Sequence, residues 1–457
     1  MPPDSSLAFS DVMTELAARR SALLERLGEG VAVLAAAPVH VRNNDVEHAY
    51  RQDSDFFYLT GLDEPESVAV ITNRHAEHRF VLFVRPRDPE RETWDGPRTG
   101  VDGAVATYGA DAAFPISELA ERLPQYLQNA PRLLFALGRD PAMDARVIAA
   151  LTSLRRRQRA GVLAPTEIVD PTAHLHPMRL RKSALELGAM QRAVDATREA
   201  HLAAMRVARP GAHEHEVEAE ILRAFRRHGC ERAAYDSIVG SGVNATILHY
   251  RKNDRRMEEG ELLLIDAGAE WGYQSADVTR TFPISGTFSK AQRAVYDVVL
   301  RAQVQAIDAV RPGATIEDVH QVTLRAITEG MIEIGLIAGP LDDALEKERY
   351  KAFYMHRTSH WLGMDVHDVG SYFVYDGDGA SAQSKPAKTK ARAMEPGMVL
   401  TVEPGIYVAK SAEAPSEYLG IGVRIEDDVL VTDAGHRDLT ASISKDPGEI
   451  ERFLASR

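Results

Sequence analysis

The sequence predicts an α/β protein of two domains, the second of which is built from two similar halves. The chain has 457 residues, which exceeds the usual size of a single hydrophobic core. Strand-like runs alternate with helical stretches over roughly the first 170 residues, as in α/β domains. One pattern of glycines and acids occurs twice in the second half of the chain, which indicates an internal duplication.

The N-terminal domain is predicted from five apolar runs, each short enough to be a strand. These runs are GVAVLAAAP, FFYLTG, ESVAVIT, RFVLFVRP and RLLFALG. A helical stretch, VIAALTSLRRRQRAG, follows them. The segment 170–178 is rich in turn formers and precedes a long helical pattern, so we place a domain boundary there. The predicted domains span 1–175 and 176–457.

Two kinds of repeat predict the duplication within the second domain. In both copies of the first, a glycine is followed by five mostly apolar residues, an acid, a variable residue and another glycine; the two acids are Asp266 and Glu403. The tetrapeptide ArgProGlyAla also occurs twice, at 209–212 and 311–314. We therefore predict two related α/β halves whose acid-tipped strands meet around a pseudo-twofold axis, with a ligand cleft between them.

Helix starts and a loop are also predicted in the second domain. Ser289 with Gln292, and Thr315 with Asp318, form capping-box patterns typical of helix N-termini. The stretch 376–392 is low in apolar residues and predicts a surface loop.

Composition excludes several classes of protein. Acids outnumber bases by 67 to 54, a net charge of −13, which argues against a nucleic-acid-binding surface. Cys230 is the only cysteine, so an intramolecular disulfide and a cysteine zinc site are excluded, and a small buried side chain is its expected role. The N-terminus lacks the pattern of a secretory signal, and no run approaches the roughly 20 apolar residues that span a membrane. We expect a cytoplasmic protein with no membrane partner.

Four carboxylates and one histidine stand at or beside the ends of apolar runs in the second domain. A single acid at such a place is usually a turn former or helix cap, but the repeat makes that explanation insufficient for the whole set. Four converging carboxylates need positive compensation, which two divalent cations supply. Oxygen-rich ligands with one imidazole favour Mn²⁺, while Co²⁺ and Zn²⁺ remain alternatives. The candidate metal ligands are Asp266, Asp277, His360, Glu403 and Glu426.

Other histidines also occur in the second domain. The sequence HisGluHisGlu at 213–216 lacks the zincin spacing and stands where a helix is predicted to start, so we interpret it as a solvated first turn. His356, His360 and His367 are best explained as a site wall in which one residue ligates and the others donate hydrogen bonds. The absence of a GxSxG motif, a phosphate-loop lysine and a strand followed by GxGxxG argues against serine hydrolases and nucleotide-binding proteins.

Longer stretches of the second domain resemble the pita-bread dinuclear metallopeptidases. These stretches are ILHYRKND, LLLIDAGAEWGYQSADVTRTFP, HRTSHWLGMDVHDVG, MVLTVEPGIYVA and GIGVRIEDDVLVT. The first domain adds YRQDSDFFYLTGLDEPESVAV and RETWDGPRTG, which are similar to the aminopeptidase P (Xaa-Pro aminopeptidase) branch. The resemblance covers nearly the whole chain and implies an N-terminal aminopeptidase P-type domain followed by a pita-bread domain.

The resemblance also implies roles for the candidate ligands. Asp266 would bind one metal, His360 and Glu403 the other, and Asp277 and Glu426 would bridge the two. Glu403 would act as the general base that takes a proton from the metal-bridging water. It would then deliver this proton to the leaving proline nitrogen.

Five further residues acquire roles in the same way. By the resemblance, His249, His356 and His367 line the substrate cleft, and His249 and His367 steady the scissile carbonyl. Arg424 and Tyr407 would orient ligand carboxylates.

The implied activity is release of the N-terminal residue from peptides with proline at the second position. The alternatives are a prolidase, which cuts Xaa-Pro dipeptides, and a metal-free family member that binds peptides or acts as a creatine-type hydrolase. Arg357 departs from the family pattern, which has glycine there, so it either alters the proline pocket or points to solvent. Family members are commonly dimers or tetramers, so the resemblance implies a homodimer or homotetramer. Trp94 either reaches the cleft of a neighbouring subunit or belongs to the core of the first domain.

Overall fold

The computed structural model describes residues 9–375 and 389–457, which form two compact units. The first unit ends at Arg179 and the second begins at Leu180. Of the predicted loop 376–392, residues 376–388 lie outside the described residues. Thr389–Ala391 form strand β16, which pairs with β15 (Phe373–Tyr375).

The first unit is a mixed six-stranded sheet with helices on both faces. Its strand order is β6-β5-β4-β1-β7-β8. The strands are β1 (Val31–Ala35), β4 (Val68–Thr72), β5 (Phe80–Val84), β6 (Ala112–Pro115), β7 (Arg132–Leu134) and β8 (Glu167–Val169). Strands β4 and β5 are buried along their whole length, which explains their unbroken apolar runs.

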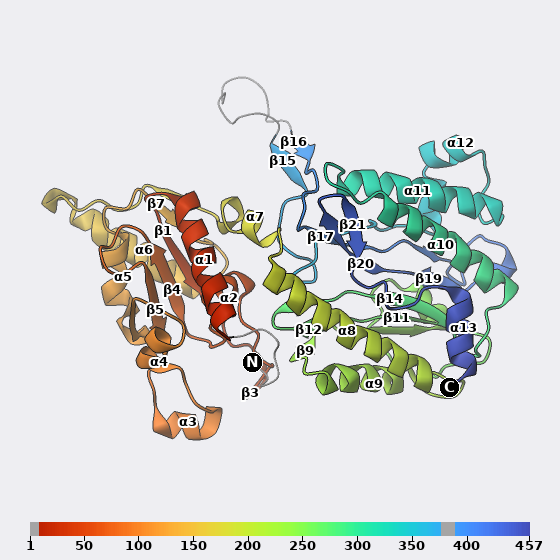
Figure 1. Ribbon diagram of the computed structural model, residues 1–457, viewed down its shortest axis with the longest axis horizontal. Coiled ribbons are helices and arrows are strands. Elements are labelled where there is room, and N and C mark those ends of the chain that lie inside the picture. Colours follow the sequence, from red (N-terminus) through yellow and green to blue (C-terminus); the bar gives the residue numbers. More distant parts are fainter. Residues whose placement is uncertain (1–8, 376–388) are drawn as a thin grey trace. The chain divides into compact units, whose positions relative to one another are not determined.

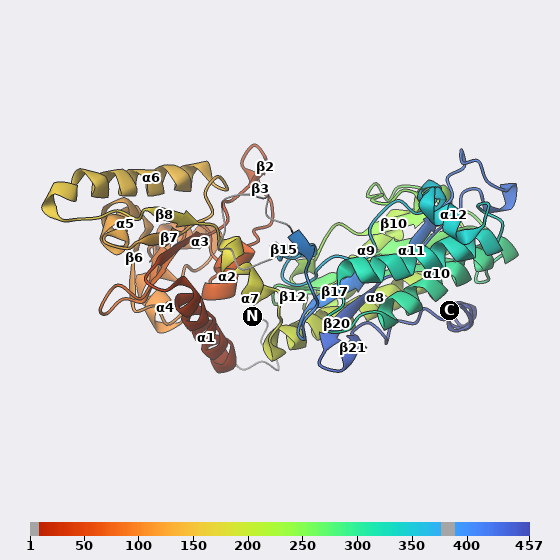
Figure 2. The same cartoon turned by 90° about the horizontal axis from the view of Figure 1, so that it is seen from above.

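Helices of the first unit cover this sheet from two sides. Helices α5 (Leu119–Leu127) and α6 (Pro141–Arg156) pack their apolar faces on one side, in a core that includes residues of β1, β4 and β5. Figure 2 shows α1 (Phe9–Leu27) on the side opposite α6. The remaining elements are β2 (Val41–Asn43), β3 (Val46–Glu47), α3 (Pro89–Asp95), α4 (Gly100–Ala106) and α7 (His176–Arg179).

One of the five predicted strands is wrong. The run FFYLTG lies in helix α2 (Ser54–Thr60). The side chain of Asp53 accepts a hydrogen bond from the backbone amide of Phe56, and Gly61 ends the helix in the left-handed region at φ 67°. These two caps favour a helix over the strand that the aromatic composition suggests.

The second unit consists of two similar halves, as predicted. In one half, helices α8 (Ala184–Val207) and α9 (Glu214–Arg227) are joined by the first ArgProGlyAla turn. In the other, α10 (Lys290–Asp308) and α11 (Ile316–Glu333) are joined by the second. The turn glycines, Gly211 and Gly313, have φ angles of 90° and 86°, which explains why the same residue stands at both positions. In the view of Figure 1, strands β11 (Leu262–Asp266) and β14 (Thr279–Pro283) lie between the two helix pairs.

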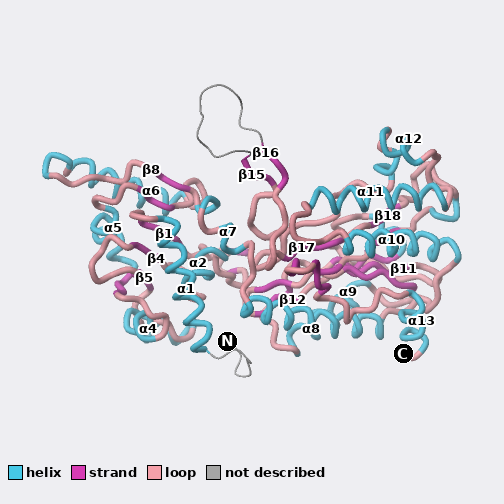
Figure 3. The backbone as a smooth tube through the Cα atoms, turned by 45° about the horizontal axis from the view of Figure 1, so that its top comes forward, coloured by secondary structure: helices cyan, strands magenta, loops and turns pink. Residues whose placement is uncertain are grey.

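The two halves also have matching antiparallel strand pairs. Strand β11 (Leu262–Asp266) lies between β10 (Ile238–Ser241) and β14 (Thr279–Pro283). In the other half, β20 (Asp427–Thr432) lies between β17 (Val399–Val402) and β21 (Gly435–Asp438). Figure 3 shows these strands in magenta with cyan helices around them. The duplication predicted from the repeats is therefore confirmed.

Shorter elements complete the second unit. They are β9 (Arg232–Ala233), β12 (Ala269–Trp271), β13 (Gln274–Ser275), β18 (Gly405–Tyr407), β19 (Gly422–Arg424), α12 (Leu341–Glu346) and α13 (Pro447–Ala455). Among the described residues, no helix is both long enough and apolar enough to cross a membrane.

Candidate metal centre

The four candidate acids occupy equivalent positions in the two halves. Asp266 is the last residue of β11, and Glu403 directly follows β17. Asp277 lies two residues before β14, and Glu426 directly precedes β20. Because β14 and β20 run antiparallel to β11 and β17, each half brings the end of one strand beside the start of the next.

The repeated glycine after each acid has a steric reason. A Cβ on Gly268 would lie 1.7 Å from the carbonyl oxygen of Ala276, so only glycine allows the chain beyond Asp266 to pass so close to the segment that carries Asp277. The equivalent Gly405 is covered by Tyr407, whose hydroxyl would lie 2.4 Å from such a Cβ.

His360 reaches the acids from a loop that precedes β15. Its backbone carbonyl accepts from the amide of Thr401 over 2.9 Å, which fixes the loop against β17. Its Nδ1 lies 3.1 Å from the carbonyl oxygen of Trp361, whereas its Nε2 lies 3.4 Å from Asp277 and 3.5 Å from Glu403. A hydrogen bond from Nδ1 to that carbonyl would leave the Nε2 lone pair free for a metal.

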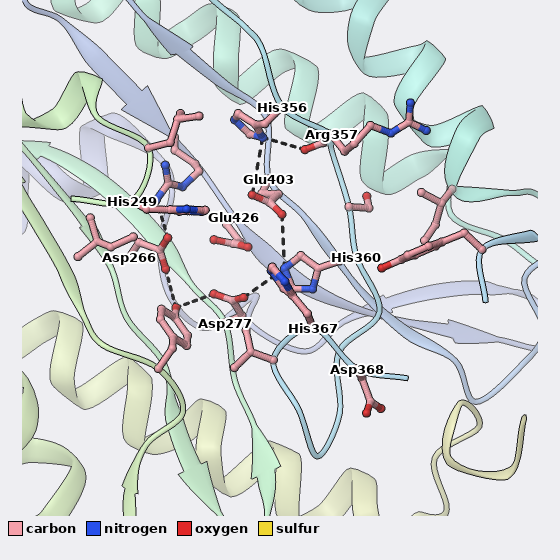
Figure 4. A pocket seen from close by; sticks show the side chains of 18 of the residues that line it. His249, Asp266, Asp277, His356, Arg357, His360, His367, Asp368, Glu403 and Glu426 are labelled. Atoms are coloured by element: carbon pink, nitrogen blue, oxygen red, sulfur yellow. Dashed lines mark hydrogen bonds and ion pairs between the residues drawn. The ribbon is translucent and has the colours of Figure 1, made fainter. Parts of the chain in front are cut away.

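The five candidate residues converge at one place (Figure 4). Asp277, His360 and Glu426 each offer a ligand atom, and these atoms lie within 4.8 Å of one another. Asp266 and Glu403 flank this group, the former through a shared contact with Tyr235 and the latter beside His360.

The electrostatics of the cluster fit divalent cations. Burial, together with the charge of Asp277, raises the pKa of Glu426 well above its usual range. Burial raises the pKa of Glu403 to about 7. Burial opposes protonation of His360, but the hydrogen bond with Asp277 and the charge of Glu403 outweigh it and raise the pKa of His360 to about 9. Without cations the cluster must therefore hold protons, and divalent metal ions would take their place.

Two residues hold Asp266 in position. Arg424, on β19, donates from Nη2 to Asp266 Oδ2 over 2.5 Å. The hydroxyl oxygen of Tyr235 lies 2.6 Å from Asp266 Oδ1 and 2.5 Å from Asp277 Oδ1. The sequence interpretation missed Tyr235, because no spacing or repeat marks it. Its only signal is its place just before β10, whose residue Ile238 pairs with Asp266.

A buried polar layer beneath the acids was also missed. The backbone amide of Asp277 donates to Asp428 Oδ2 over 3.1 Å. Arg280, fully buried, forms an ion pair of 2.7 Å with Asp427. Asp427 and Asp428 directly follow Glu426, so this layer fixes both acids that precede strands.

The cluster lies in a cleft of about 1080 Å³ that is also lined by the three histidines His249, His356 and His367. Burial, with a smaller effect of Arg424, lowers the pKa of His356 to about 4, so its ring is neutral near pH 7. Its Nε2 lies 2.9 Å from the hydroxyl of Tyr407. His367 packs edge-on against His360 with ring centroids 4.2 Å apart, and burial lowers its pKa.

Arg357 turns its side chain away from the acid cluster (Figure 4). Its guanidinium pairs with Glu317 of α11, another residue of the cleft wall. The side chain of Arg357 is 59% exposed. Of the two expectations for this residue, the structure favours the solvent-facing one.

Two further sequence interpretations are settled by burial. Trp94, on α3, is 85% exposed, so the alternative that places it in the core is wrong. The helix start at 213–216 is solvated at His215 and Glu216, but Glu214 is fully buried, and the interpretation is wrong for that residue. Five hydrogen bonds compensate the burial of Glu214.

Comparisons with known proteins agree with this site. The model of metallopeptidase family M24 matches residues 188–433, and that of the aminopeptidase P N-terminal domain matches 16–135. The chain therefore belongs to metallopeptidase family M24. An Xaa-Pro aminopeptidase from Escherichia coli K12 is 42% identical over 444 residues, which cover 97% of this chain and 98% of that protein.

Solved structures extend the similarity to the fold. Aminopeptidase PepP from Pseudomonas aeruginosa is 46% identical, with a TM-score of 0.92 and coverage of 97% of this chain and 98% of that one. Zinc-substituted aminopeptidase P from E. coli in complex with product is 41% identical, with a TM-score of 0.91 and coverage of 99% of both chains. The predicted pita-bread fold is confirmed, and membership of a metallopeptidase family implies a divalent metal.

Proposed function

We propose that this protein is a metal-dependent exopeptidase that releases the N-terminal residue from peptides with proline at the second position. The observation that carries the proposal is the convergence of four carboxylates and one histidine in a single cleft of an M24 chain. Similarity to Xaa-Pro aminopeptidases over almost the whole chain supports the choice of substrate.

The site suits two divalent metal ions. In this proposal Asp266 would help to hold one ion, His360 and Glu403 the other, and Asp277 and Glu426 both. Two ions balance the charge of the four carboxylates. Mn²⁺ suits the oxygen-rich ligand set best, with Co²⁺ or Zn²⁺ as alternatives. When bound, such ions lower the pKa of water and so supply a nucleophile for the carbonyl carbon.

Glu403 is the residue proposed to move protons. Its carboxylate lies 3.5 Å from His360 and 3.9 Å from His356, at the edge of the cluster that faces the cleft. In the absence of metal ions, burial raises its pKa to about 7. A carboxylate placed beside the attacking water is the kind of group that serves as a general base. It would take a proton from the attacking water and deliver it to the proline nitrogen as the peptide bond breaks.

The histidines and Arg424 are proposed to position the substrate. His249 and His367 would donate hydrogen bonds to the scissile carbonyl as negative charge develops there. His356 is neutral and held by Tyr407, so it can contact the substrate without adding a charge. Arg424 donates to the hydroxyl of Tyr407 over 3.1 Å as well as to Asp266, and so links the cleft wall to the metal ligands.

A comparison of substrates tests this function. A bond to proline is a tertiary amide without an N–H, so the enzyme must select the ring rather than a donor. We expect cleavage of Xaa-Pro-Xaa tripeptides at the first bond. Cleavage of Xaa-Pro dipeptides alone would identify a prolidase instead. Retention of full activity after complete metal removal would indicate a metal-free mechanism.

We further propose that the chain assembles into a homodimer or homotetramer. The support is the exposure of Trp94, because a large aromatic side chain that is 85% exposed is a candidate interface anchor.

A further inference from the structure

The carboxylate of Glu214 is fully buried and accepts five hydrogen bonds. Oε1 accepts from the amide and the hydroxyl of Ser241, both over 2.7 Å, and from Asn244 over 3.0 Å. Oε2 accepts from the hydroxyl of Tyr250 over 2.7 Å and from the amide of Arg255 over 2.9 Å. All five partners of Glu214 are hydrogen-bond donors. They suit an ionised carboxylate, whose oxygens can only accept.

These donors bracket one loop. Ser241 is the last residue of β10, and Arg255 ends the segment that leads away from it. The backbone amide of Glu214 also donates to the carbonyl oxygen of Arg255 over 3.0 Å. Glu214 therefore holds both ends of the segment 242–255, with Tyr250 as a contact between them.

His249 lies in this segment, directly before Tyr250. Tyr250 packs beside the buried group Ile238, Leu264 and Tyr407, whereas His249 lines the cleft. The side chain of His249 makes no hydrogen bond or ion pair with any residue that the structure describes. No hydrogen bond of its own ring holds it in the cleft, so its position there depends on the backbone of the segment.

We infer that Glu214 is a positioning residue for His249, an inference that rests on the function proposed above. The buried carboxylate fixes the backbone of 242–255, and that backbone presents the imidazole to the scissile carbonyl. Preorganisation of this kind matters because a displacement of about 1 Å at a reacting group can cost on the order of 100-fold in rate.

Hydrogen exchange tests the structural part of this inference without any substrate. Glu214→Gln keeps the side-chain shape but turns an amide NH₂ toward a group of donors. We expect backbone amides in 242–255 to exchange about tenfold faster in this variant. Glu216→Gln is the matched control, since Glu216 stands in the same helical turn with its side chain 48% exposed, and its exchange in that segment should equal the parent's. Unchanged exchange in Glu214→Gln would overturn the inference.

A double-mutant cycle tests whether Glu214 acts through His249. The metal-loaded parent and the metal-loaded Glu214→Gln variant are compared on a proline tripeptide. The substitution should lower kcat about tenfold and change KM by less than about threefold. In a His249→Ala background the same substitution should lower kcat by less than about twofold, because the group to be positioned is absent. Equal losses in both backgrounds would overturn the inference.

A second variant covers the case in which Glu214→Gln does not fold. Tyr250→Phe removes one of the five hydrogen bonds and leaves the other four, and it should change exchange and kcat in the same directions by a smaller factor. If Tyr250→Phe showed no faster exchange in 242–255, or no loss of kcat, the result would contradict the inference. A parent enzyme that fails to cleave proline peptides would contradict the proposed function, while the exchange result would still decide whether Glu214 fixes the segment.

Discussion

Glu426 and Thr279 join the two halves of the second unit by two hydrogen bonds. The backbone amide of Glu426 donates to the carbonyl oxygen of Thr279 over 3.1 Å, and the hydroxyl of Thr279 donates to Glu426 Oε2 over 2.6 Å. The first bond aligns strands of the two halves, and the second orients a proposed metal ligand. One residue of β14 thus couples the duplicated fold to the acid cluster.

Thr279→Val should therefore weaken metal binding. The substitution preserves the branched shape but removes the hydroxyl that orients Glu426 and accepts from Arg424 Nε over 3.0 Å. Loss of such an outer contact typically lowers metal affinity by about 10-fold to 100-fold. Calorimetric titration of the metal-free protein with Mn²⁺ checks this, and an affinity equal to that of the parent would contradict the assigned role of Thr279.

Glu403→Gln should abolish most of the activity. Glutamine cannot accept the proton from the attacking water, and loss of a general base and ligand of this kind is expected to cost roughly 10²-fold to 10⁴-fold in kcat. Glu413→Gln, a change at an exposed acid of the same unit, serves as the control and should retain the parent rate. If the kcat of Glu403→Gln lay within threefold of the kcat of that control, Glu403 would not be the general base.

Burial of His201 should make the stability of the metal-free protein depend on pH. His201 is fully buried on α8, and burial lowers its pKa to about 4 from an ordinary value near 6.5. His201 therefore binds a proton more readily in the unfolded chain than in the folded protein. The stability of the fold with a neutral His201 is intact above about pH 6.5 and is lost as the pH falls toward 4. The expected loss is about 3 kcal/mol by pH 4.

His201→Gln lacks this titration and isolates the effect. The free energy of unfolding of the parent, minus that of the variant, should fall by about 3 kcal/mol as the pH is lowered from 7 to 4. Urea denaturation in the presence of a chelator measures it. A difference that is constant over this pH range would show that His201 does not titrate as its burial requires.

Trp94→Ala should weaken self-association. The side chain is exposed on the short helix α3, so its removal costs the fold of the first unit little. Light scattering on parent and variant over a range of concentrations measures the change in mass. Identical masses at every concentration would exclude Trp94 as an interface anchor.

The sequence alone predicted the parts of the fold that depend on local patterns. The duplicated turns and the acids at the ends of β11 and β17 were recognisable because each lies within a short, repeated segment. The helix α2 was assigned wrongly as a strand because the capping contacts of Asp53 and Gly61 outweighed an aromatic run.

The missed residues share a different physical basis. Tyr235 contacts Asp266, 31 residues away, and Asp277. Glu214 reaches partners 27 to 41 residues further along the chain. Such contacts follow from the tertiary arrangement of strands and loops, so no spacing in the sequence marks them. Both residues gave at most an ambiguous local signal before the fold was known.

The proposed activity depends on bound metal, and a single titration tests this dependence directly. The chelated enzyme is titrated with Mn²⁺ while bound metal per chain and hydrolysis of an Xaa-Pro-Xaa tripeptide are measured together. We expect negligible hydrolysis without metal and full recovery as binding reaches two ions per chain. Full hydrolysis by the metal-free enzyme, or no recovery when the ions are bound, would contradict it.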